Sequence, residues 1–271
     1  MVSVIITGMD SGYARLIYQI NAFGFDSSPR GESTSEMLGM QFRLLDPTNN
    51  LPLATGRKLN RKIAFAEGLQ LVSGRSYPEL MVRIAPNFNE FTNGGTWFHG
   101  AYGPRLRNQL PRVLDALQSD ADSRQAIATI WDPNYDGHGG TADTPCTIGL
   151  QFFNRRDKLQ LITTMRSNDV WWGVPYDVFQ FTFLQIQLAQ VLGLEPGVYT
   201  HQAGSFHLYD RDRVEASRVT ANHLVRAPID QTICMVPSWP VIQDVAESIL
   251  NNVGHPLETA FGASVRTALH E

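Results

Sequence analysis

The sequence predicts one globular domain, residues 1–271, in which α-helices and β-strands are mixed. Apolar residues at helical spacing mark core helices at 60–72 and 178–192. Two apolar runs, 148–153 and 159–165, flank a short polar turn, which is typical of an antiparallel hairpin. We find no internal repeat and no linker that divides the chain, and 271 residues are enough to enclose a sizeable core.

The N-terminal quarter begins with a predicted strand at 1–6. This apolar run is short and lacks a basic flank, so it does not resemble a signal peptide. A helix is expected at 11–22, followed by a turn-rich segment at 23–39 and a strand at 40–44. Arg30 lies in that turn-rich segment. A loop arginine is usually solvated, although one between ordered elements can reach a ligand.

The next quarter holds three candidate side chains. Glu67 lies on the helix expected at 60–72, where a carboxylate more often turns outward than serves a function. Phe88 lies in the aromatic loop 87–95, and Tyr102 follows it. Loop aromatics can stack on a planar ligand, but most of them are packing residues.

The centre of the chain leads to a cysteine. A short helix is expected at 110–118, then a loop containing Arg124 and a strand at 126–131. Glycine-rich residues 133–144 predict a mobile surface loop that runs directly into Cys146. This loop lacks the lysine and the helix that a phosphate-binding P-loop requires.

The predicted hairpin brings two of these residues together. Cys146 lies at the start of one strand and Arg166 at the end of its partner, so pairing places the two ends side by side. Beyond it, the helix at 178–192 ends before Gly193, a plausible cap. The remaining elements expected are a strand at 199–209 and helices at 213–224, 241–253 and 257–270.

The charge balance excludes one class of function. The formal net charge is −4 and the pI is about 6.0, without a basic run, which argues against a protein that grips a nucleic-acid backbone. A nucleotide monomer is still compatible with this charge, because a few arginines bind one phosphate. No apolar run is long enough to span a bilayer.

The two cysteines are far apart in sequence, so they form neither a disulfide framework nor a metal cluster. This pattern predicts a reducing, cytoplasmic setting, which is the host cytoplasm if the protein is viral. Cys234 has no polar motif around it and is expected to be a buried structural thiol.

Four motifs resemble the thymidylate synthase family. They are Pro145-Cys146, Arg166-Ser167-Asn168-Asp169, Gly173-Val174-Pro175-Tyr176-Asp177 and Gly204-Ser205-Phe206-His207-Leu208-Tyr209. Upstream motifs also match: Arg30-Gly31 resembles the family's phosphate loop, Glu67 its catalytic glutamate, Tyr102-Gly103 its active-site tyrosine and Asp122-Ser123-Arg124 the arginine donated across its dimer. The resemblance covers residues 25–210 in the family's order.

The resemblance implies an α+β fold with a large mixed β-sheet that is flanked by helices and dimerises through the sheet. It also implies transfer of a one-carbon unit to C5 of a pyrimidine nucleoside monophosphate, with 5,10-methylenetetrahydrofolate as co-substrate and no metal. A thiolate that adds at C6 makes C5 nucleophilic, and Cys146 is expected to be that thiolate. Because a free cysteine has a pKa of about 8.5, Arg166 is expected to favour the charged form.

The family's other roles carry over residue by residue. The expected phosphate ligands are Arg30, Arg166, Ser167 and Arg124 of the partner subunit, and the expected sugar ligands are His207 and Tyr209. Glu67 is expected to move protons through ordered water, with Tyr102 in the same catalytic set. The expected folate contacts are Asp169 at the pterin, Phe88 and Trp172.

Asp177 departs from the family's pattern. Members that methylate deoxyuridylate carry asparagine here, and an amide can offer both a donor and an acceptor to uracil. An ionised carboxylate only accepts, which suits the N4 amino group of cytosine. Asp177 therefore indicates a cytidylate substrate, since a uracil carbonyl would face a buried carboxylate.

Other departures concern the folate side and the C-terminus. Phe88 replaces an expected tryptophan, Thr147 replaces the histidine after the nucleophile, and Gln125 replaces the second of two arginines. The final residues 268–271 lack the apolar tail that excludes water in methylating members. Water can then add to the exocyclic methylene and give a hydroxymethyl group.

The motifs as a set resemble deoxycytidylate hydroxymethylase more than thymidylate synthase. Within the family, the alternatives are a dCMP methyltransferase, a CMP hydroxymethylase and an atypical thymidylate synthase that acts on dUMP. From another class, the chain could be a non-catalytic nucleotide- or RNA-binding relative, although binding alone needs no thiolate.

Overall fold

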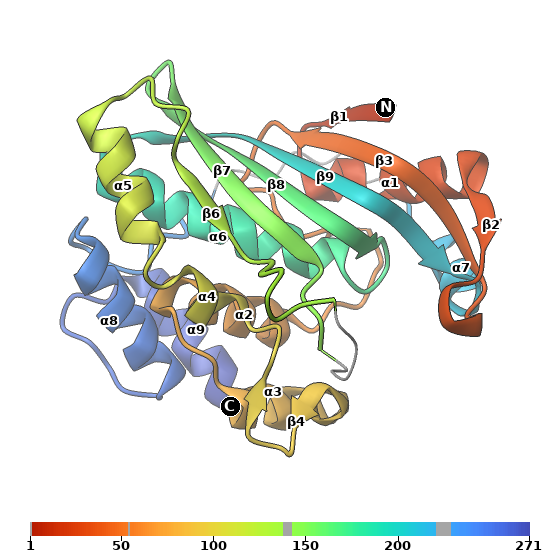
Figure 1. The fold of residues 1–271 in the computed structure, drawn as a ribbon. Coiled ribbons are helices and arrows are strands. Elements are labelled where there is room, and N and C mark those ends of the chain that lie inside the picture. The colour runs from red at the N-terminus through yellow and green to blue at the C-terminus, as the bar shows by residue number, and fades with distance from the viewer. Residues whose placement is uncertain (1, 54, 138–142, 221–228) are drawn as a thin grey trace.

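A seven-stranded mixed β-sheet forms the centre of the structure (Figure 1). The computed structural model describes residues 2–53, 55–137, 143–220 and 229–271. The strand order is β1-β3-β9-β8-β7-β6, and β2 also pairs with β3. The strands are β1 (Val2–Ile6), β2 (Phe25–Ser27), β3 (Thr34–Leu44), β6 (Ile127–Thr129), β7 (Thr147–Arg155), β8 (Lys158–Asp169) and β9 (Glu195–Tyr209), with β4 (Thr92–Asn93) and β5 (Trp97–Phe98) in a separate two-stranded sheet.

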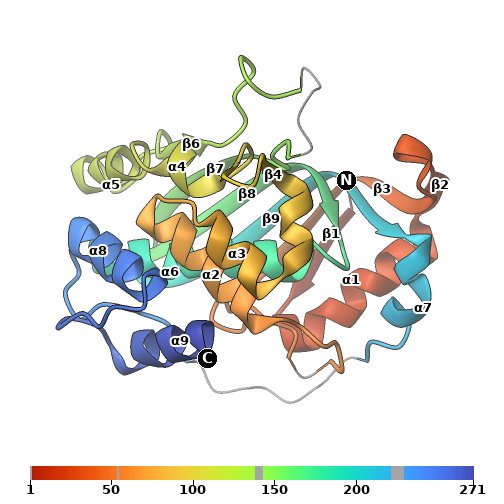
Figure 2. The same cartoon turned by 90° about the horizontal axis from the view of Figure 1, so that it is seen from below.

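Helices form a layer on one face of this sheet (Figure 1, Figure 2). Helix α6 packs directly on β8 and β9. Helix α2 in turn contacts α6, α8 and α9. The helices are α1 (Met9–Phe23), α2 (Arg61–Ser73), α3 (Pro78–Ile84), α4 (Tyr102–Leu106), α5 (Leu110–Ser119), α6 (Val174–Leu192), α7 (Arg213–Ala216), α8 (Trp239–Leu250) and α9 (Ala260–His270), with short 3₁₀ turns η1 (Pro29–Gly31), η2 (Pro86–Phe91) and η3 (Asp210–Asp212). The predicted mixed sheet flanked by helices is confirmed.

Helix α6 is the centre of the core. Every residue from Val174 to Ala189 is buried, since the sheet covers one side of the helix and α2 another. The prediction began this helix at Val178, but it begins at Val174, because Pro175 is tolerated in a first helical turn. Asp177 therefore lies in the first turn, where the helix dipole favours a negative charge.

The predicted hairpin is confirmed as β7 and β8. Both residues of its turn, Arg156 and Asp157, have a φ of 56°, as a tight two-residue connection of twisted strands requires. The backbone N–H of Arg166 donates to the carbonyl of Cys146 at 2.8 Å, so the two ends meet as predicted.

Strand β3 is longer than predicted. It starts at Thr34, within the segment expected to be only turn-rich. Gly39 interrupts the alternation, because it adopts a left-handed φ of 63° and has no partner in the register between Leu38 and Met40. This irregularity hid the first half of the strand from the sequence pattern.

The other predicted elements differ mainly at their ends. Of the helix expected at 213–224, only α7 is present within the described residues, and 221–228 lie outside them. Helix α9 begins at Ala260, where Thr259 caps it by accepting from the Gly262 N–H. In the expected loop 133–144, residues 138–142 also lie outside the described part. None of the described helices is both long and apolar enough for a membrane span.

Candidate active site

The four predicted catalytic residues line one cavity of about 400 Å³. Glu67 reaches it from α2, Tyr102 from α4, Cys146 from the segment before β7 and Asp177 from the first turn of α6. Residues far apart in sequence thus bring a thiol, two carboxyl groups and a phenol to a single space. Among the described residues, no group of three or more His, Cys, Asp and Glu side chains is arranged to hold a metal ion.

Cys146 is half-buried and reduced, and Nη2 of Arg166 lies 3.7 Å from its sulfur. Burial is the largest influence and raises the pKa of the thiol, whereas the Arg166 guanidinium lowers it and the charge of Asp177 raises it. The net pKa is above that of an ordinary cysteine. Arg166 therefore acts in the predicted direction but does not offset burial. Cys234 is buried, as predicted.

Glu67 is an isolated carboxyl group inside the cavity. Its Oε2 atom is buried and has no hydrogen-bond partner among the described residues. Burial, and then the charge of Asp177, raises the pKa of Glu67 to about 8. The side chain is therefore largely protonated at neutral pH, which suits a group that gives up and retrieves protons.

Tyr102 is fixed by close approach of α4 to α2. The neighbouring Gly103 allows this approach, because a Cβ atom there would lie 2.3 Å from the carbonyl oxygen of Gln70. The Tyr102 ring stacks on Phe181 at a centroid distance of 5.9 Å. Burial, followed by the nearby Asp177, raises the pKa of the Tyr102 phenol, so it remains a hydrogen-bond donor.

Asp177 is a buried carboxyl group that accepts hydrogen bonds at both oxygens. Gln180 Nε2 donates to Oδ1 at 2.9 Å, and Asn168 Nδ2 donates to Oδ2 at 2.7 Å. Burial raises the pKa of Asp177 to about 7, while the two amide donors act in the opposite direction. The group is thus poised between ionised and neutral forms near physiological pH.

Among the predicted nucleotide ligands, Ser167, His207 and Tyr209 lie toward the ends of β8 and β9, and Arg30 lies in η1. Nη2 of Arg30 donates to the hydroxyl of Tyr209 at 3.4 Å, and the ring of His207 lies 5.3 Å from that of Tyr209. Arg30 is exposed and has a left-handed φ of 55°, a conformation that is rare outside glycine and often marks a functional position. Ser167 pairs with Ser205 in the strand register.

Arg124 lies elsewhere in this chain. Its carbonyl oxygen accepts from Gln151 Nε2 at 3.1 Å, and its side chain lines a separate recess with Arg155. Because β6 runs antiparallel to β7, this position is at the opposite end of β7 from Cys146. The structure of one chain therefore does not bring Arg124 to the site, and the predicted contribution across a dimer stays a prediction.

Aromatic side chains form one wall of the cavity. Phe88 lies 6.3 Å from Phe91 and 6.1 Å from Phe98 in edge-to-face contacts, and the largely exposed Trp172 also lines the cavity. Asp169 lies at the end of β8, where its Oδ1 accepts from the N–H of Trp171 at 2.7 Å. Burial raises the pKa of Asp169 to about 6. The sequence analysis did not assign Phe91 or Phe98 to the site.

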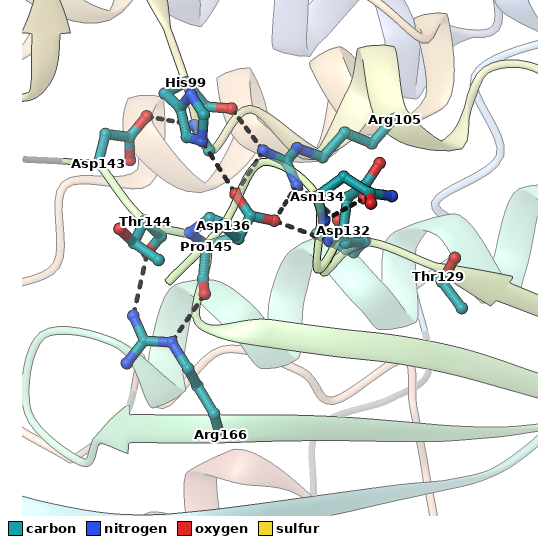
Figure 3. A network of polar contacts seen from close by, with 12 residues as sticks. His99, Arg105, Thr129, Asp132, Asn134, Asp136, Asp143, Thr144, Pro145 and Arg166 are labelled. Carbon is teal, nitrogen blue, oxygen red and sulfur yellow. Dashed lines mark hydrogen bonds and ion pairs between the residues drawn. The ribbon is translucent and has the colours of Figure 1, made fainter. Parts of the chain in front are cut away.

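A buried ion pair ties Asp136, which precedes Cys146 in the chain, to the 99–105 segment (Figure 3). Both carboxylate oxygens of Asp136 accept from Arg105, at 2.5 and 3.0 Å, and Oδ1 also contacts His99 Nε2 at 2.9 Å. Burial opposes ionisation of Asp136, but bonds from Arg105, the Asp132 N–H and His99 lower its pKa to about 2. The sequence analysis missed this cluster, because its members look like ordinary loop residues.

Further contacts hold the same segment nearer the cysteine (Figure 3). The N–H of Gly100 donates to Asp143 Oδ2 at 2.7 Å. Arg166 donates from Nε to the Pro145 carbonyl at 2.9 Å and from Nη2 to the Thr144 carbonyl at 3.1 Å. The backbone before the nucleophile is therefore tied to the 99–105 segment on one side and to β8 on the other.

A sequence model of the thymidylate synthase family matches residues 11–235. The chain belongs to the thymidylate synthase family. This membership and the mixed sheet confirm the resemblance seen in the motifs.

Relatives within the family include phage proteins named deoxyuridylate hydroxymethyltransferase. The protein of Bacillus phage SP01 is 31% identical over 199 residues, which cover 67% of this chain and 52% of the relative. That of Pseudomonas phage M6 is 30% identical over 173 residues, covering 61% and 49%. That of Delftia phage PhiW-14 is 28% identical over 276 residues, covering 95% and 71%. The chain thus spans about half the length of the first two relatives.

Loss of the buried Asp136 charge should destabilise the protein. Asp136→Asn leaves Arg105 without its ionic partner in a site where the carboxylate is fully buried, and such a loss costs about 3 kcal/mol. We also expect faster alkylation of Cys146 by iodoacetamide, since Asp136 helps to hold the 99–105 segment, to which Asp143 is tied through the Gly100 N–H. Urea denaturation and mass-spectrometric labelling measure the two effects.

Asp122→Asn is the matched control for Asp136→Asn. Asp122 is almost fully exposed and lies 3.8 Å from Arg155, so its loss should leave stability and labelling unchanged. Equal denaturation midpoints for Asp136→Asn and wild type would contradict the anchoring role of the ion pair.

Proposed function

We propose that the protein transfers a hydroxymethyl group to C5 of dCMP, using 5,10-methylenetetrahydrofolate and water. The observation that carries this proposal is the pairing of Cys146 with Asp177 in one cavity, where both Asp177 oxygens already accept amide hydrogen bonds. A nucleophile for C6 and an acceptor for an exocyclic amine are thus available to the same pyrimidine ring.

Asp177 is the proposed reader of the base. A carboxylate has about four lone-pair sites, so an ionised Asp177 that accepts from Asn168 and Gln180 still has capacity for the N4 amino group of cytosine. The two amides hold the acid oriented and favour its ionised form. Uracil would place the O4 carbonyl against that acceptor, which is unfavourable unless Asp177 is protonated.

Cys146 is the proposed nucleophile. Its thiolate would bond to C6 and move the C5–C6 double-bond electrons toward C5. C5 would then take the one-carbon unit, whose bond to the folate nitrogen breaks, and would lose its proton. Water would add to the resulting exocyclic methylene, and expulsion of the Cys146 sulfur would restore the C5–C6 double bond. Because burial keeps the free thiol protonated, Cys146 must lose its proton as the ring is attacked. Glu67, with an unpaired carboxyl oxygen in the same cavity, is the proposed proton carrier. A merely nucleotide-binding relative would need neither group.

The aromatic wall fits a flat ligand such as the folate pterin. Phe88, Phe91, Phe98 and Trp172 offer ring surface to the cavity. Asp169 does not line the cavity itself but offers a carboxyl group at the end of β8, three residues before Trp172. When bound, 5,10-methylenetetrahydrofolate supplies the one-carbon unit. The residues of this chain would then hold the base, the Cys146 thiol and the Glu67 carboxyl group close to that unit.

The relatives favour hydroxymethyl over methyl transfer, because their names state that product class. The same names state deoxyuridylate as the substrate, so a dUMP hydroxymethyltransferase is the second candidate. Asp177 is the feature of this chain that favours the cytosine nucleotide. A CMP substrate differs only at the sugar 2′ position, which these contacts do not address.

We also propose that two copies pair through the open face of the sheet, opposite the helical layer in Figure 1. Such a dimer would carry Arg124 toward the proposed phosphate site of the other copy, which would also include Arg30 and Arg166.

Product analysis tests the proposed function. The protein is incubated with methylenetetrahydrofolate and, in turn, dCMP, CMP and dUMP, and the nucleotide mass is measured together with dihydrofolate absorbance. We expect 5-hydroxymethyl-dCMP without dihydrofolate. Dihydrofolate formation with dCMP would identify a methyltransferase instead, and product only from dUMP would identify the second candidate.

Substitution of the nucleophile should separate binding from turnover. Cys146→Ser is expected to abolish product formation, since a serine hydroxyl is a far poorer nucleophile, while dCMP binding changes little. Isothermal titration measures binding, and mass spectrometry measures product. Cys146→Ser protein that still forms product would show that another group attacks C6.

Base preference should follow the ionisation of Asp177. Because Asp177 has a raised pKa of about 7, its ionised form increases as pH rises through that value, and the dCMP-over-dUMP ratio of kcat/KM should rise with it. Asp177→Asn should lower that ratio about 10- to 100-fold and remove its pH dependence. Titration of Glu67 affects both substrates and cancels in the ratio. An unchanged ratio in the variant would refute base reading by Asp177.

A further inference from the structure

A chain of buried polar groups continues behind Asp177, away from the cavity. Asn168 Nδ2 donates to Asp177 Oδ2 at 2.7 Å, and Asn168 Oδ1 lies 2.9 Å from His201 Nε2. His201 Nδ1 in turn lies 2.8 Å from the hydroxyl oxygen of Tyr199. All four side chains are buried, and only Asp177 lines the cavity. We call Asn168, His201 and Tyr199 the relay.

When Asp177 is ionised, only one assignment of hydrogen-bond donors and acceptors along the relay is consistent. The carboxylate only accepts, so the Asn168 amide must present its NH₂ group to Asp177 and its oxygen to His201. That oxygen needs a donor, which places the proton of a neutral imidazole on Nε2. Nδ1 is then an acceptor for the Tyr199 hydroxyl. Burial lowers the pKa of His201 to about 3 and raises that of Tyr199, so both keep these roles.

Two packing features hold the relay in place. The ring of His201 stacks on Phe42 at a centroid distance of 4.8 Å and an interplanar angle of 16°, which fixes the plane of the imidazole. Gly173 leaves room for the Asn168 amide, because a Cβ atom at Gly173 would lie 2.6 Å from Asn168 Nδ2 and 3.2 Å from Asp177 Oδ2. The amide therefore reaches Asp177 only because residue 173 has no side chain.

The reversed assignment of donors and acceptors would require a protonated Asp177. If the Asn168 amide turned over, its oxygen would face the Asp177 oxygen, and two acceptors at hydrogen-bond distance require a proton between them. Asp177 would then be a neutral carboxylic acid whose proton is donated to Asn168, so the charge that disfavours a carbonyl at C4 of the base would be gone. The amide orientation thus decides whether Asp177 faces the base as a charged acceptor, which favours an amino group, or as a neutral acid, which tolerates a carbonyl group.

We propose that His201 and Asn168 are positioning residues that select a pyrimidine with an amino group at C4, because they hold Asp177 as a hydrogen-bond acceptor. This inference rests on the proposed function only in taking the base to lie against Asp177. Neither residue lines the cavity, so the effect on substrate choice acts through Asp177.

The test is the ratio of dCMP to dUMP affinity in His201→Phe. Phenylalanine keeps the stacking on Phe42 but removes the Nε2–H donor, so the Asn168 amide loses the contact that fixes its orientation. We expect the ratio of the two dissociation constants, measured by isothermal titration without folate, to move about tenfold toward dUMP. The pH at which the ratio changes should also rise, since a protonated Asp177 is then favoured.

Phe42→Leu is the control, because it disturbs the same packing and leaves every hydrogen bond of the relay intact. Its affinity ratio should equal that of wild type. Tyr199→Phe removes the hydroxyl that contacts both His201 Nδ1 and Thr163, so its ratio should lie between those of wild type and His201→Phe. Should His201→Phe fail to fold, Tyr199→Phe still decides the question.

Equal weakening of dCMP and dUMP binding in both relay variants would overturn the inference, since a purely structural role lowers both affinities alike. The product formed from dCMP decides the proposed function separately. A wild-type enzyme that methylates dCMP would refute hydroxymethyl transfer and leave the relay intact, whereas an unchanged affinity ratio would refute the relay and leave the product assignment intact.

Discussion

Burial of the Asp177 carboxylate is the constraint on which the site depends. An ionised carboxyl group inside a protein is costly unless donors surround it. Here the sheet supplies Asn168, the next turn of α6 supplies Gln180, and the helix start supplies a favourable dipole. These donors only partly offset burial, so the acid stays near its titration point. The protonation state of such a group changes when its ligand or its neighbouring side chains change only slightly.

The rest of the architecture brings reactive groups to this acid. The β7–β8 hairpin sets Arg166 beside Cys146, and bonds from Arg166 and from the Gly100 N–H hold residues 143–145, directly before the thiol. Helix α2 carries Glu67 along the surface of α6, where the same burial that affects Asp177 also raises the pKa of Glu67. The core helix α6 therefore organises both the packing and the chemistry.

The sequence predicted those parts of the site that depend on local pattern. Cys146 and Arg166 follow from a hairpin with alternating apolar residues, and Glu67 and Tyr102 were located by motifs that resemble a family. The Asp136 ion pair could not be predicted, because it joins a loop residue to Arg105 on the short helix α4 and to His99, and no periodicity relates these positions. His201 left a weak signal: it alternates with Tyr199 and Ala203 on the buried face of a strand, where a histidine requires a polar partner.

Two carboxyl groups in one cavity also divide the proton chemistry between them. The pKa of Asp177 rises to about 7 and that of Glu67 to about 8, and the charge of Asp177 contributes to the second shift. Because the charge of Asp177 raises the pKa of Glu67, ionisation of Asp177 helps Glu67 to retain its proton. With Asp177 ionised, the pair presents one hydrogen-bond acceptor and one protonated acid to the same cavity. The proposed function requires this combination, because one site must accept from an amine and move protons at the same pH.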